Sequence, residues 1–153
     1  MQYAWKLGGV HKASAQEAGQ LCERLASEGR LTAADLVEES KPLTAPLHGE
    51  FEWDDTEAAV KWREQQARVI INHIVIVKQE ENPVPITRAF VKLESSKPQY
   101  ESITVVVNNE DKYKTLLSLA KRELENFTKK YKGLKELDKI MDAIGVFLDS
   151  EVA

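Results

Sequence analysis

A run of acidic and aromatic residues, Glu50–Glu57, contains the residue types and spacing most suggestive of chemistry in this sequence. Neighbouring carboxylates of this kind can form an acidic recognition surface, either for a basic protein or as a mimic of DNA phosphates. They can also act locally, because Asp is a favourable N-cap residue and acidic side chains stabilise the first turn of a helix. Both interpretations stay open. The candidate partner-binding residues are Glu50, Glu52, Trp53, Asp54 and Asp55.

Catalytic and metal-binding patterns do not occur in the sequence. The three histidines, His11, His48 and His73, lack the spacing of metal ligands, and the adjacent carboxylates of the acidic run cannot converge on one ion. Cys22 lies on an apolar stripe, where a thiol behaves as a small hydrophobic group. No nucleophile elbow, phosphate-binding loop or dinucleotide-binding fingerprint is present. We therefore expect a protein that is not an enzyme and that needs no metal or cofactor.

Basic residues that could meet nucleic-acid phosphates are sparse in the first third of the chain. Residues 1–57 contain five Lys or Arg against eleven Asp or Glu. A helix-turn-helix with its turn at Lys41–Thr44 would pack Leu36 against Leu47, although Pro42 and Glu50 depart from that motif. A basic cluster also lies near the C-terminus, where a helix dipole favours cations in any case. The candidate nucleic-acid-binding residues are Lys41, His48, Arg63, Arg68, Lys129, Lys130 and Lys132.

The elements that must position these side chains begin with three helices. Ser14 and Thr32 are expected to cap helices at 14–28 and 32–41, because each is followed three positions later by an acidic residue. A third helix is predicted to start at Asp54. Its apolar stripe includes Ala59, Trp62, Val69, Ile70 and His73.

Residues rich in β-branched side chains predict a small antiparallel sheet in the middle of the chain. Near Val69 the helical period weakens, so we expect the chain to change from helix to strand at Ile74–Lys78 rather than continue as a helix. Further strands are predicted at Ile86–Leu93 and Ile103–Val107, each preceded by a segment that contains proline. Exposed edges of such a sheet can pair between chains, which favours a homodimer.

The last third of the chain is predicted to be a helical hairpin. Asn108 or Asn109 caps a helix that ends at Gly133, and a final helix spans Leu134–Leu148. The sequence therefore predicts a mostly helical α+β fold. A trihelical N-terminal lobe occupies residues 1–75, and residues 76–153 combine a small antiparallel β section with the C-terminal helical hairpin.

The composition is that of a globular chain. The sequence has 153 residues, of which 42% are hydrophobic and 30% charged, and its formal net charge is −4. An acidic balance disfavours non-specific coating of nucleic acid. The N-terminus lacks a signal-peptide pattern, and no apolar run approaches the roughly 20 residues of a membrane span. We therefore expect a cytoplasmic protein without a membrane partner.

The acidic run and its surroundings resemble a family of small phage and prophage proteins. The shared pattern is Pro-Leu-His, Phe-Glu-Trp-Asp-Asp, an alanine pair and Gln-Ala-Arg, here at 46–48, 51–55, 58–59 and 66–68. The Tyr3-x-Trp5 start and Lys130-Tyr131-x-x-Leu134 also fit, whereas Thr44-Ala45 stands before the proline where a serine is common. The resemblance implies a phage or prophage origin, the host cytoplasm as the location and a helix-turn-helix-like N-terminal region. It brings no assigned activity.

These inferences together predict a non-enzymatic phage accessory protein that acts by binding. The first expectation is a nucleic-acid-associated or regulatory role, with DNA bound through the trihelical lobe. The alternative is a protein-binding modulator or inhibitor of a host factor, such as a defence protein, that uses the acidic surface. A third class, a structural component of the phage particle, also stays open.

Overall fold

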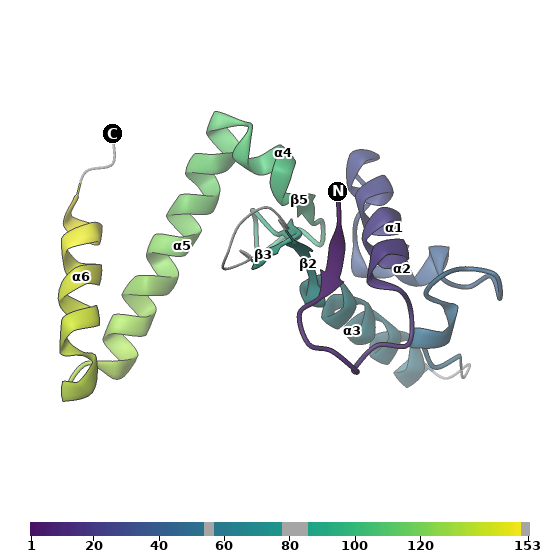
Figure 1. The fold of residues 1–153 in the computed structure, drawn as a ribbon, viewed down its shortest axis with the longest axis horizontal. Coiled ribbons are helices and arrows are strands. Elements are labelled where there is room, and N and C mark those ends of the chain that lie inside the picture. The colour runs from purple at the N-terminus through teal and green to yellow at the C-terminus, as the bar shows by residue number, and fades with distance from the viewer. Residues whose placement is uncertain (54–56, 78–85, 151–153) are drawn as a thin grey trace. The chain divides into compact units, whose positions relative to one another are not determined.

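The computed structural model describes residues 1–53, 57–77 and 86–150, and the chain divides into two compact units, Met1–Asn108 and Asn109–Ala153 (Figure 1). The fold is mostly helical α+β with a small antiparallel sheet, as predicted. The boundary expected between residues 75 and 76 falls inside the first unit. It does so because the strand that contains both residues pairs with the N-terminal strand of the chain.

The first unit has five helical elements in its described residues, and the first two begin directly after their predicted capping residues. The five elements are α1 (Ala15–Ser27), α2 (Ala33–Glu39), the one-turn 3-10 helix η1 (His48–Glu50), α3 (Glu57–His73) and the short α4 (Ile103–Val107). The Ser14 and Thr32 side chains accept the backbone N–H groups of Glu17 and Asp35, so both predicted N-caps are confirmed. Gly29 follows α1 with a φ of 68°, a left-handed conformation that glycine adopts without strain. The predicted Asp54 cap lies outside the described residues.

Two small antiparallel sheets join these helices. The strands are β1 (Tyr3–Trp5), β2 (Ile74–Val77), β3 (Ile86–Arg88), β4 (Phe90–Val91) and β5 (Glu101–Ser102). The first sheet has the order β1-β2-β3, with Ala4 opposite Val75 and Val75 opposite Arg88, and the second pairs β4 with β5. The predicted change from helix to strand at Ile74 is confirmed. The predicted strand Ile86–Leu93 is present as two strands, which separate at Ala89.

The strand predicted at Ile103–Val107 was wrong, because these residues form α4. The Ile103 N–H donates to the Ala89 carbonyl, and the chain turns into a helix directly after the short strand β5. The turn buries Val106 completely. Burial of one side chain therefore outweighs the weak strand preference of a β-branched run.

The core of the first unit lies where α1, α2 and α3 gather around the sheets (Figure 1). Its largest fully buried side chains include Leu25, Leu36, Ile70 and Phe90. The Tyr3 ring packs against α1 at Gly19, where an added Cβ would overlap the atoms of the ring. The N-terminal strand is therefore fixed to α1 by a contact that only glycine permits.

The second unit is the predicted helical hairpin. It consists of α5 (Glu110–Tyr131), the 3-10 turn η2 (Lys135–Leu137) and α6 (Asp138–Asp149), and α5 and α6 run side by side (Figure 1). Asn109 caps α5 by accepting the Lys112 N–H at 3.0 Å, and Gly133, with a φ of 105°, lies in the turn between the helices. No helix in the described ranges 1–53, 57–77 and 86–150 has both the length and the apolar character needed to cross a bilayer.

Candidate functional site

Glu50 holds the loop after β1 against η1. Its carboxylate accepts the backbone N–H groups of Lys12 at 2.6 Å and Ala13 at 2.7 Å, and it also bonds Nδ1 of His11 at 3.1 Å. The Glu50 side chain is only 8% exposed. A carboxylate with three donors and little solvent is a structural anchor, so Glu50 does not form part of an exposed acidic surface.

Two histidines extend this hydrogen-bond chain into α3. Nε2 of His11 lies 2.9 Å from Nδ1 of His73, and the His11 ring packs on Trp5 with the centroids 4.1 Å apart. If Nδ1–H of His11 donates to the carboxylate, Nε2 of the neutral ring accepts from Nδ1–H of His73. Two protonated rings would instead point N–H groups at each other. The hydrogen bonds that connect Glu50, His11 and His73 are therefore compatible with at most one charged imidazole ring.

The pKa values at this chain follow from its contacts. Burial by itself raises the pKa of Glu50. The hydrogen bonds from Ala13, His11 and Lys12 outweigh that effect, so the pKa of Glu50 lies below its ordinary value of 4.5. Burial, followed by the nearby charges of His11 and Lys6, lowers the pKa of His73 below 6.5. Glu50 is thus held as a carboxylate and His73 as a neutral ring at neutral pH.

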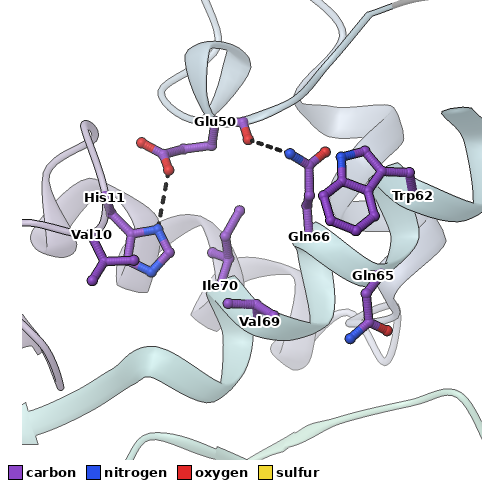
Figure 2. Close-up of a pocket in the computed structure, with 8 residues that line it drawn as sticks. All are labelled: Val10, His11, Glu50, Trp62, Gln65, Gln66, Val69 and Ile70. Carbon is purple, nitrogen blue, oxygen red and sulfur yellow. Dashed lines mark hydrogen bonds and ion pairs between the residues drawn. The ribbon is translucent and has the colours of Figure 1, made fainter.

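A pocket of about 260 Å³ opens beside this hydrogen-bond chain, on the outer side of α3 (Figure 2). In Figure 2 the Glu50 carboxylate reaches His11 and its carbonyl reaches Gln66, while Ile70 and Val69 lie below and Trp62 lies beside Gln66. Most of the accessible lining is apolar, and Trp62 is 55% exposed. The lining residues are Val10, His11, Glu50, Trp62, Gln65, Gln66, Val69 and Ile70.

The size and lining of this pocket limit what it can hold. Small-molecule and cofactor sites are commonly about 300–1,000 Å³, and they surround most of the ligand. A shallower apolar pocket beside an exposed tryptophan suits one apolar side chain of a protein partner.

Among residues 1–53, 57–77 and 86–150 no group of three His, Cys, Asp or Glu side chains is arranged to hold a metal ion. Cys22 is fully buried in α1, and burial raises the pKa of its thiol.

The acidic run predicted as a partner surface is divided by the structure. The Glu50 side chain has little exposure, and the Trp53 ring stacks on His48 at 5.0 Å and donates its Nε1–H to the His48 carbonyl at 2.9 Å. Glu52 is exposed. Asp54 and Asp55 lie outside the described residues. Of the acidic side chains whose exposure the structure describes in this run, Glu52 is the exposed one, and it lies two residues after the pocket residue Glu50.

The predicted nucleic-acid-binding residues of the first unit are engaged within the protein. Arg63 is buried, donates to the Glu52 carbonyl at 3.0 Å and lies 5.4 Å from the centre of the Trp53 ring. Lys41 pairs with Glu38, and Arg68 pairs with Glu64. The predicted second helix of the helix-turn-helix frame is the three-residue turn η1, where His48 Nδ1 bonds the Ser40 carbonyl. These residues stabilise local structure and do not form a shared basic face.

The basic residues predicted near the C-terminus lie in the second unit. Lys129 and Lys130 are exposed in the last turn of α5, and Lys132 follows directly as its C-cap residue. Lys130 Nζ lies 5.2 Å from the centre of the Tyr131 ring. This position is the one that a helix dipole favours for cations, so it does not by itself indicate a phosphate site.

The pocket was not predicted from the sequence, because its α3 residues Trp62, Val69 and Ile70 were assigned to one apolar stripe. Trp62 and Val69 belong to the predicted apolar stripe of α3, yet both are exposed, whereas Ala59, Ala67, Ile70 and Ile71 are buried. The available signal was the width of the apolar surface of α3, since Trp62 and Val69, one heptad apart, lie beside the buried stripe.

Comparisons of the chain with protein families, with curated proteins and with solved structures found no match.

Proposed function

We propose that this chain is a non-catalytic binding protein, and that its first unit binds a partner protein by enclosing one apolar side chain in the pocket beside Trp62. The observation that carries this proposal is an exposed tryptophan on the wall of an apolar pocket. Tryptophan is enriched at the energetic centres of protein interfaces, and adjoining exposed apolar side chains mark interaction surfaces.

The rigidity of the pocket wall supports this proposal. Glu50 is held by three donors, and its carbonyl accepts the Gln66 Nε2–H at 3.4 Å, so the loop and α3 are linked on both sides of the opening. A wall that is already ordered loses little conformational entropy on binding. The geometry therefore favours a preformed site over one that must fold around its partner.

The charge distribution favours a protein partner over nucleic acid. Residues 1–108 carry sixteen Asp or Glu and twelve Lys or Arg. Two of the cations of α3, Arg63 and Arg68, are already bonded to a carbonyl and a carboxylate. Nucleic-acid affinity depends mainly on free cations that meet phosphates. The resemblance to phage and prophage proteins suggests that the partner is a bacterial host protein.

The proposal is tested by affinity capture from a bacterial lysate with matched variants on one helix. Trp62→Glu places a charge on the pocket wall. Val60→Glu makes the same change at an exposed apolar position of α3 that does not line the pocket. We expect the wild type and Val60→Glu to retain one lysate protein in the presence of nuclease, and Trp62→Glu to lose it.

Two outcomes would overturn the proposal. One is capture that survives Trp62→Glu unchanged. The other is recovery of nucleic acid alone, together with binding of a labelled DNA duplex that weakens steeply with salt, as a DNA-binding role requires. Circular dichroism of both variants establishes that the fold is retained.

A further inference from the structure

One face of α5 carries an uninterrupted coiled-coil pattern. Apolar residues follow each other at alternating intervals of four and three positions, the 3.5-residue period of helices that pack lengthwise against another helix. The intervals continue over the whole helix without a polar residue in any seam position. The seam residues are Tyr113, Leu117, Ala120, Leu124, Phe127 and Tyr131.

Only part of this seam is covered within the second unit. Leu117, Leu124 and Tyr131 are half-buried, whereas Tyr113, Ala120 and Phe127 are exposed, and we call these last three the open row. None of the 22 residues of α5 is buried, and in the described range 109–150 Ile144 of α6 is the single buried residue. A hairpin of this size does not make a core of its own, and units of about 40 residues usually need an additional partner.

The charges of the two helices complement each other. Helix α5 carries six basic and four acidic residues, whereas α6 carries one basic and three acidic ones. The acidic residues of α6, Asp138, Asp142 and Asp149, are exposed. Lys114, which pairs with Glu110 on the exposed surface of α5, directly follows Tyr113 of the open row. A second hairpin that lays its α6 along the open row would therefore bring acidic side chains beside basic ones.

Within the hairpin, the same two helices already pack against each other. Helix α6 packs along α5, where Lys121 Nζ lies 5.3 Å from the centre of the Phe147 ring. A second copy repeats the same association on the other side of α5. Two-fold symmetry then covers both open rows at once, and two hairpins close a four-helix bundle.

We propose that α5 and α6 pair with the same helices of a second copy of this chain to form an antiparallel four-helix bundle. With 12 residues, α6 is about 18 Å long, which is close to the span of about 21 Å from Tyr113 to Phe127 in the open row. Two such contacts, one from each copy, together bury on the order of 1,000 Å², which is the size of a stable interface. The bundle joins the two chains through their second units.

The test is the mass of the full chain in solution, measured by light scattering and by sedimentation over a range of concentrations. Ala120→Glu places a charge in the middle of the open row, and Ser118→Glu makes the matched change at an exposed position of α5 outside the seam. Because both sites are exposed within one chain, both variants should keep the hairpin. We expect a wild-type mass of twice 17.3 kDa.

Ala120→Glu should weaken dimerisation at least about a hundredfold, because the dimer would bury an unpaired carboxylate, and Ser118→Glu should change it less than about threefold. A monomeric wild type at every concentration, as expected if another part of the chain covers the open row, overturns the proposal. An assembly larger than two copies, or a dimer insensitive to Ala120→Glu, also overturns it. Thermal unfolding of the wild type gives an independent readout, since the midpoint of a dimer rises with protein concentration.

Discussion

Replacement of Glu50 by alanine should destabilise the first unit more than replacement of any exposed acidic residue beside it. The change removes the acceptor of three hydrogen bonds, from the Lys12 and Ala13 N–H groups and from His11. A hydrogen bond to a charged group contributes about 1.5–3 kcal/mol. The Lys12 amide is exposed and can bond water in the variant, so loss of this hydrogen bond contributes less to the destabilisation than loss of the other two. The expected loss in the free energy of unfolding is about 2–4 kcal/mol.

The assay is chemical denaturation followed by tryptophan fluorescence and by circular dichroism. Trp5 reports directly on the affected loop, because its Nε1–H donates to the Ala13 carbonyl at 2.9 Å. Glu50→Gln keeps an oxygen for the two backbone N–H groups but lacks the charge, so its loss should be intermediate. Glu52→Ala is the control, since the Glu52 side chain is exposed, and it should cost less than about 0.5 kcal/mol.

The diagnostic result is the order of destabilisation. It should be largest for Glu50→Ala, intermediate for Glu50→Gln and smallest for Glu52→Ala. In a thermal melt, the loss for Glu50→Ala corresponds to a fall of roughly 10 °C or more in the midpoint. Equal stability of Glu50→Ala and Glu52→Ala would refute the conclusion that Glu50 anchors the loop. It would also remove the argument that the pocket wall is preformed.

Two further predictions concern the same unit. Because the folded state lowers the pKa of both His73 and Glu50, the unfolded state binds more protons, and stability should fall on acidification, first below about pH 6.5 and then below about pH 4.5. His73→Gln should reduce the first loss in denaturation curves taken between neutral pH and pH 5, and an unchanged loss would count against the assignment to His73. Gly19→Ala should destabilise the protein by about 1–3 kcal/mol or more, because its Cβ would meet the Tyr3 ring, whereas Gly145→Ala in α6, which meets nothing within 4 Å, should be neutral or stabilising in the same melt.

Local signals in the sequence were sufficient to predict the starts of α1, α2 and α5. Ser14, Thr32 and Asn109 each bond the amide three residues ahead, and such caps depend only on neighbouring residues. The run Ile103–Val107 shows where local preference fails, since the burial of Val106 in a helix outweighed the strand preference of its neighbours. The strand β1 was not predicted, because its three residues acquire a strand conformation only by pairing with β2.

The site could be predicted only in part. Glu50 was identified as a notable residue, but its role depends on His11 and His73, which lie far from it in the sequence and have no characteristic spacing. Arg63 was expected to be free for phosphate, yet the fold buries it against Trp53. Such pairings are set by tertiary packing, so a single sequence contains no periodic signal for them.

The pairing of β1 with β2 has a consequence for the kinetics of folding. Tyr3 lies opposite Ile76, so closing this sheet also closes a loop that contains α1, α2 and α3, and loop-closure entropy opposes the step until those helices have packed. The contacts of the α5–α6 hairpin are local in sequence, and helices of that kind form within microseconds. Refolding should therefore have a fast helical phase and a slower phase in which Trp5 becomes ordered.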